Sequence, residues 1–265
     1  MTEIRDRWAA GTTYEAFMGR WSRLLAPAFV AWTAVPAGAH WLDVGCGTGA
    51  MTEAICAHAD PGSVVGCDPA EPLLEYARSR AAAGRASYLV AGAGELPPRA
   101  GGYGCVASLL ALNFLPDPDA AIREMRSLAA PNGVVAACVW DYGGRMELLR
   151  YFWDAVRGVD PASRGLDEGA RFPLCRPEPL TELFRAGGLR DVCCEPIDIA
   201  TRFSDFDDYW RPFLGGTGPA PTYVASLDDA RRAALARRLQ QTLPEGAGGS
   251  IPLTARAWAV RGTAP

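Results

Sequence analysis

A short run of glycines between a buried strand and a helix constrains the fold of this chain more than any other feature. Residues 40–44 (HWLDV) are predicted to form a buried strand, and the next five residues read Gly-Cys-Gly-Thr-Gly. Residues 50–59 return to the three- and four-residue spacing of a helix. Glycine permits a tight turn and lets a ligand approach the backbone, while the helix start offers free N–H groups. The sequence therefore predicts a strand, a ligand-binding loop and a helix in immediate succession.

The same order of strand and helix continues over about the next hundred residues. Further buried strands are predicted at 63–67, 87–91, 103–109 and 133–139, with helices at 72–83 and 119–129. Strands that alternate with helices in this way predict βαβ units and a parallel sheet covered on both faces.

The remaining segments are mainly helical. Helices are predicted at 13–35, 146–157, 177–186, 205–213 and 227–242, and strands at 192–200 and 251–260. Two late strands separated by helical segments indicate an antiparallel edge strand. We therefore expect a single α/β domain with a Rossmann-like, doubly wound, mostly parallel sheet. Its core is expected at about 36–142, 191–202 and 250–262, with helical cap segments at 1–35, 143–190 and 203–245.

Composition excludes several classes of protein. The net charge of −4 and the pI of about 5.3 argue against a nucleic-acid partner. No uncharged apolar run is long enough to span a membrane, and the charged N-terminus does not resemble an export signal, so a cytoplasmic protein is expected. All 26 basic residues are arginine, which excludes Schiff-base and phosphate-loop lysines. The eight cysteines form no Cys-x-x-Cys pair, so no metal site is predicted.

Two acidic residues accompany the glycine loop. Asp43 lies in the strand before the loop, and Asp68 follows the second predicted strand, where a carboxylate can accept hydrogen bonds from a ribose diol. A dinucleotide dehydrogenase would need a third glycine, and residues 50–52 (AMT) do not provide it. A loop that serves only as a turn would not account for both carboxylates.

These residues resemble a known family. Residues 43–49 (DVGCGTG) are similar to the first motif of class I S-adenosylmethionine-dependent methyltransferases, and residues 65–69 (VGCDP) to the second. Degenerate forms of later motifs follow at 96–97, 112–118 and 130–133. The resemblance covers about residues 12–142 and is closest to the branch that contains quinone-biosynthesis and other small-molecule methyltransferases.

The resemblance implies S-adenosylmethionine as the cofactor and suggests its contacts. The loop of Gly45, Cys46 and Gly47 would hold the methionine part, Asp43 its ammonium group and Asp68 the ribose hydroxyls. The adenine would face the segment after the third strand, where the family often has an aspartate. Here that position is Gly92, so binding is expected to be weakened but not abolished. The other implied cofactor contacts are Pro69, Ala93, Leu109, Asn113 and Arg20.

Few residues qualify for the chemical step. Asp141, after the fifth strand, either accepts a proton or orients a substrate hydroxyl, or it is a turn carboxylate. Asn113 is either a polar group in the pocket or a turn residue. Tyr14 is placed to close over the methionine and is the second catalytic candidate, and Arg20 either meets the methionine carboxylate or is solvated. His40 and His58 lie at the wrong ends of their elements for a base.

The predicted function is methyl transfer from S-adenosylmethionine to a small, largely hydrophobic metabolite by a monomer or homodimer. Consecutive aromatic residues at 151–153 (YFW) either enclose an apolar acceptor or belong to the core. One alternative is a cofactor-binding protein of the same fold that catalyses another reaction, such as a cyclisation, or only binds and regulates. Another is a protein or RNA methyltransferase.

Overall fold

The computed structural model describes residues 15–80, 85–215 and 218–265, which divide into two compact units. The sheet unit contains residues 19–139, 174–197 and 257–265. The helical unit contains the described residues up to 18 together with 140–173 and 198–256. The predicted division into a core and cap segments remains a prediction.

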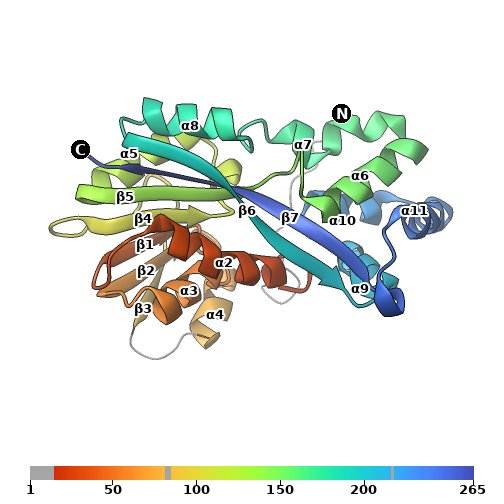
Figure 1. Ribbon diagram of the computed structural model, residues 1–265, viewed down its shortest axis with the longest axis horizontal. Coiled ribbons are helices and arrows are strands. Elements are labelled where there is room, and N and C mark those ends of the chain that lie inside the picture. The colour runs from red at the N-terminus through yellow and green to blue at the C-terminus, as the bar shows by residue number, and fades with distance from the viewer. Residues whose placement is uncertain (1–14, 81–84, 216–217) are drawn as a thin grey trace. The chain divides into compact units, whose positions relative to one another are not determined.

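A seven-stranded sheet organises the fold, with strand order β3-β2-β1-β4-β5-β7-β6 (Figure 1). Its members are β1 (His40–Val44), β2 (Ser63–Asp68), β3 (Ala86–Val90), β4 (Tyr103–Leu109), β5 (Ala129–Trp140), β6 (Arg190–Phe203) and β7 (Ile251–Thr263). β1 to β5 pair in parallel, and β7 is antiparallel. The predicted fold class is confirmed; the antiparallel strand lies between β5 and β6.

The helices of the sheet unit lie close to the predicted ranges. They are α2 (Arg20–Thr33), α3 (Ala50–His58), α4 (Glu71–Arg80), α5 (Pro118–Leu128) and α8 (Pro177–Ala186). The segment predicted as a helix over 13–35 begins, within the described residues, as a π-helical turn, η1 (Glu15–Gly19). The end of α2 is stabilised because Arg261 Nη1 donates hydrogen bonds to the carbonyls of Trp32 (2.8 Å) and Thr33 (2.6 Å).

The parallel register brings the site segments to one edge of the sheet. Asp43 on β1 stands opposite Gly66 on β2 and Ala107 on β4. β1 is buried along its length, as expected for a central parallel strand covered on both faces. The carboxyl ends of β1, β2 and β4 therefore deliver their following loops side by side.

Aromatic side chains form the core of the helical unit. Its helices are α6 (Glu147–Val159), η3 (Pro161–Leu166), α7 (Glu168–Arg171), α9 (Phe206–Trp210), η4 (Arg211–Gly215), α10 (Pro219–Ser226), α11 (Asp229–Thr242) and η5 (Ala247–Gly249). Phe152 stacks on Phe213 with ring centroids 4.6 Å apart, and Trp153 is fully buried beside Tyr223. Of the two readings of residues 151–153, core packing therefore holds for Phe152 and Trp153.

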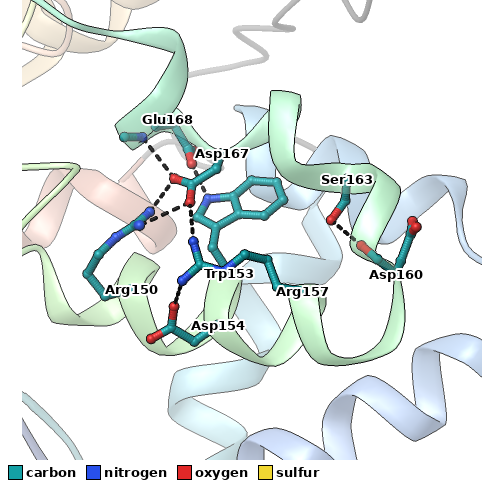
Figure 2. A network of polar contacts seen from close by, with 9 residues as sticks. Arg150, Trp153, Asp154, Arg157, Asp160, Ser163, Asp167 and Glu168 are labelled. Carbon is teal, nitrogen blue, oxygen red and sulfur yellow. Dashed lines mark hydrogen bonds and ion pairs between the residues drawn. The ribbon is translucent and has the colours of Figure 1, made fainter.

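A polar network crosses this aromatic core between α6 and α7 (Figure 2). Asp167 accepts hydrogen bonds from both terminal nitrogens of Arg150, and Arg157 Nη1 lies 3.4 Å from its Oδ2. The neighbouring Glu168 is almost fully buried, and its carboxyl accepts a hydrogen bond from the Trp153 indole N–H. Burial raises the pKa of Glu168 to about 7. The Asp167 carboxylate is thus paired with arginines, whereas the Glu168 carboxyl is bonded mainly by a neutral donor, the Trp153 indole.

Among the helices that the structure describes, none has the length and apolar character needed to cross a membrane.

Glu168 predicts how stability depends on pH. Its folded-state pKa of about 7 lies above the ordinary value of 4.5, so the folded protein holds this proton more tightly than the unfolded chain does. Its contribution to the free energy of unfolding is complete below pH 4.5 and is lost as the pH rises to about 7. We expect urea titrations of Glu168→Gln to show a smaller fall than the wild type between about pH 5 and about pH 8.

Asp167→Asn is the matched control. It leaves the half-buried Arg150 without this carboxylate, so we expect a loss of about 1.5–3 kcal/mol between about pH 5 and about pH 8. A Glu168→Gln variant with the same pH dependence as the wild type would contradict the assignment.

Candidate functional site

The loop after β1 is folded by three glycines with left-handed backbones. Gly45, Gly47 and Gly49 have φ values of 71°, 52° and 85°. The N–H groups of Gly45 and Cys46 both donate to the carbonyl of Cys67, at 2.8 and 2.9 Å. A Cβ at Gly45 would lie 2.5 Å from the Cβ of Ala111, so this position needs glycine for space as well as for backbone conformation.

Asp68 connects this loop to the end of β2. Its Oδ2 accepts the Gly47 N–H at 3.0 Å, and its Oδ1 accepts the Ala70 N–H at 2.8 Å. Burial raises the pKa of Asp68, and these two N–H donors act in the opposite direction. The predicted pair of glycine loop and Asp68 is therefore brought together in the sheet unit.

Asp43 lies directly before the loop and is fully buried. Thr52 Oγ1, in the first turn of α3, donates a hydrogen bond of 2.6 Å to its Oδ2. No group in residues 15–80, 85–215 or 218–265 hydrogen-bonds Oδ1. Burial raises the pKa of this carboxyl to about 7, and the Asp68 charge acts in the same direction. The site thus holds a buried carboxyl oxygen that is ready to accept a further donor.

Arg23 holds the glycine loop from α2, and sequence reasoning missed it. Its Nη2 donates to the Thr48 carbonyl at 3.2 Å, and its Nη1 pairs with Glu53 of α3 at 2.6 Å. The predicted cofactor contact in this segment is Arg20, whose guanidinium carbon lies 4.2 Å from the Trp21 ring centroid. The partners of Arg23 lie 25 and 30 residues away, so no local pattern could indicate them.

The segment after β3 comes close to the end of β2. The Ala91 N–H donates to the Asp68 carbonyl at 3.3 Å, and a Cβ at Gly92 would lie 3.8 Å from the Cβ of Pro69. Glu124 of α5 holds the segment by accepting the N–H groups of Gly94 (2.6 Å) and Leu96 (3.1 Å). Pro69 and Ala93 are exposed, whereas Leu109 is buried at the end of β4.

The predicted catalytic residues do not lie in the sheet unit. Asp141 belongs to the helical unit, where its Oδ2 accepts the Arg145 N–H at 2.9 Å and its carbonyl accepts the Met146 N–H at 3.1 Å. This geometry is that of a turn carboxylate at the start of α6, and a role in proton transfer remains a prediction. Tyr14 lies outside the described residues.

Asn113 lies in η2 (Leu112–Phe114), the short helix that follows β4. Its side-chain nitrogen and oxygen are both buried, and within the described chain neither has a hydrogen-bond partner. Ser108 Oγ on β4 is likewise buried and unpaired there. In the part of the chain that the structure covers, no three His, Cys, Asp or Glu side chains gather as a metal site would require.

Comparisons with known proteins agree on the family. A model described as a methyltransferase domain matches residues 42–133. The demethylmenaquinone methyltransferase of Roseiflexus castenholzii is 32% identical over 178 residues, 62% of this chain and 74% of that protein. The ubiquinone biosynthesis O-methyltransferase of Coxiella burnetii is 28% identical over 172 residues, 64% of this chain and 71% of that protein.

A solved structure extends the likeness to the whole chain. The [4+2]-cyclase SpnF superposes with a TM-score of 0.53 at 18% identity, covering 100% of this chain and 87% of that one. At this level of identity the likeness concerns the fold.

Proposed function

The chain belongs to the class I S-adenosylmethionine-dependent methyltransferases, and we propose that it methylates a small, largely hydrophobic metabolite of the quinone or specialised type. The observation that carries the proposal is the pair of buried carboxyls beside the glycine loop. Asp68 is bonded to the Gly47 N–H, and Asp43 keeps one oxygen without a protein partner among the described residues. A ligand with a pair of hydroxyl groups for Asp68 and a cationic group for Asp43 would complement this arrangement.

The residues of the sheet unit fit the cofactor. The buried Asp43 Oδ1 is suited to the ammonium group, directly or through water, and the left-handed loop at Gly45 and Gly47 leaves the backbone open to the methionine part. Asp68 is suited to the ribose hydroxyls, because each of its oxygens accepts one backbone N–H, from Gly47 or Ala70, and keeps a further lone pair. The bound cofactor supplies an electrophilic methyl group on a sulfonium, so the protein need only orient the acceptor and exclude water.

Two lines support a small acceptor. The relatives from Roseiflexus castenholzii and Coxiella burnetii are named for menaquinone and ubiquinone chemistry. The net charge of −4 disfavours a nucleic-acid substrate. A second candidate function is a reaction other than methyl transfer, with the cofactor bound but not consumed. The structural likeness to the [4+2]-cyclase SpnF is the reason to test for it.

The proposed function predicts turnover that depends on Asp68. The purified protein, given S-adenosylmethionine and a panel of alkylated catechols and naphthohydroquinones, should form S-adenosylhomocysteine and a methylated product, both measured by mass spectrometry. Asp68→Ala should weaken cofactor affinity by about 1.5–3 kcal/mol, because charge-assisted hydrogen bonds to the carboxylate are lost. Cofactor binding without turnover of any acceptor would favour the second candidate, and unchanged affinity in a folded Asp68→Ala variant would reject the ribose assignment.

Asp43 predicts that cofactor affinity depends on pH. Below the pKa of about 7 the carboxyl carries a proton that the cofactor's ammonium group must displace. Calorimetry should therefore show the dissociation constant falling by up to about tenfold between about pH 6 and about pH 8, then levelling. Asp43→Asn keeps an acceptor for Thr52 but no titratable group, so its affinity should be weaker and nearly flat over this range. If the cofactor affinity of Asp43→Asn still depended on pH, a group other than Asp43 would be titrating.

Gly92 predicts a gain of affinity. Among the described residues, a Cβ at Gly92 has one neighbour within 4 Å, the Pro69 Cβ at an ordinary contact distance of 3.8 Å, so a side chain can be added there without a clash at Cβ. Gly92→Asp would supply an acceptor for the adenine amino group and should tighten binding by about 1.5 kcal/mol, roughly tenfold in dissociation constant. Gly92→Ala is the control, since it adds the Cβ without the carboxylate and should change affinity little. If the two variants bind alike, the adenine does not face this position.

A further inference from the structure

The buried amide of Asn113 carries a free-energy cost in the folded protein. An amide side chain offers two donors and one acceptor oxygen, and within the described residues the amide of Asn113 uses none of them although its polar atoms are buried. Leaving buried polar groups unpaired costs about 1–3 kcal/mol, and most such groups in folded proteins find partners. An amide of this kind at the carboxyl edge of a parallel sheet indicates that its partner is a ligand.

The backbone before Asn113 is also unusual. Leu110 has a φ of 62°, a left-handed conformation that is rare for a bulky side chain, and its N–H donates to the Cys138 carbonyl at 2.7 Å. This bend brings Ala111 against Gly45, where a Cβ would lie 2.5 Å from that of Ala111. The strained turn therefore fixes Ala111 against the glycine loop, and Asn113 follows it by two residues. Such strain is often found at functional sites.

The strand order separates this amide from the proposed cofactor contacts. Gly92 follows β3, Asp68 ends β2 and Gly45 follows β1, so the adenine, ribose and methionine assignments run along consecutive strands. Asn113 follows β4, the next strand beyond β1. The reacting end of the cofactor, and with it the acceptor, is thus expected on the β4 side.

We propose that Asn113 binds the methyl acceptor, and that the acceptor is an uncharged phenol or enol. This inference rests on the proposed function. The amide Nδ2 can donate to an acceptor oxygen and Oδ1 can accept from a hydroxyl, so a molecule carrying both groups satisfies the side chain. An amide does not titrate, so Asn113 orients the nucleophilic oxygen and takes no proton. As the bond from this oxygen to the methyl group forms and the bond from the sulfonium sulfur to the methyl group breaks, the hydroxyl proton passes to water and S-adenosylhomocysteine is left. A cationic or purely apolar acceptor would leave part of the amide unpaired.

Asn113→Leu separates this role from a structural one. Leucine has a similar size and removes the unpaired polar atoms, so we expect the melting temperature to stay equal or to rise by about 2–4 °C. With 4-hexylcatechol as the probe acceptor, we expect kcat/KM to fall by about 10- to 100-fold, while the dissociation constant for S-adenosylmethionine stays within about twofold.

Ser108→Ala is the matched control. It removes a buried hydroxyl on β4 that, like the Asn113 amide, is unpaired among the described residues. It should raise stability without changing the kinetics of catechol methylation. The dimethyl ether of the catechol, which cannot donate, should bind the cofactor-loaded wild type and Asn113→Leu equally weakly.

Two results would overturn the inference. A clear loss of stability in Asn113→Leu would make the amide structural, and weaker cofactor binding with an unchanged KM for the catechol would make it a cofactor contact. If the wild type methylates no acceptor, the proposed function fails separately. Melting curves and calorimetric titration of the catechol into cofactor-loaded protein would then still decide whether Asn113 binds this class of molecule.

Discussion

The glycine loop keeps its shape because its backbone is closed against the end of the neighbouring strand. The carbonyl of Cys67 accepts two consecutive N–H groups of the loop, and the Asp68 carboxylate accepts a third. These contacts require β1 and β2 to pair in the register that sets Val44 opposite Cys67. A shift of one residue would send Asp68 to the other face of the sheet, so the register that builds the core also builds the site.

Asp43 shows how that site is held ready. Burial of an ionised carboxylate is costly, and the Thr52 hydroxyl offsets part of the cost at one oxygen only. The carboxyl therefore carries a proton more readily than an exposed aspartate does, and ionises most easily when a cation arrives. We therefore expect an uncharged side chain at this position to give higher stability and lower ligand affinity, a trade that is common at functional sites.

The sheet and the glycine loop could be predicted because their signals are local. The strand at His40–Val44, the loop after it and the acid at Asp68 follow from periodicity and glycine spacing within thirty residues. Arg23 and Glu53 meet across 30 residues on different helices, and their charges resemble those of any solvated surface. α7 has only four residues, too few for a periodic pattern, so Glu168 gave no sign that it would be buried.

The same electrostatic arrangement occurs in both units. In each, one carboxylate accepts hydrogen bonds at both oxygens, Asp68 from backbone N–H groups and Asp167 from arginines, and a second carboxyl is buried nearby with a single side-chain donor. Burial is the main cause that raises the pKa of the second carboxyl to about 7 in each pair, and the charge on the first carboxylate acts in the same direction. In the helical unit the arginines already neutralise that charge, so ionising Glu168 brings only a cost. In the sheet unit both carboxyls lie beside the cofactor loop, where a cationic ligand can offset the cost of ionising Asp43. Glu168 is therefore a carboxyl that stabilises a core, whereas Asp43 is suited to binding a ligand.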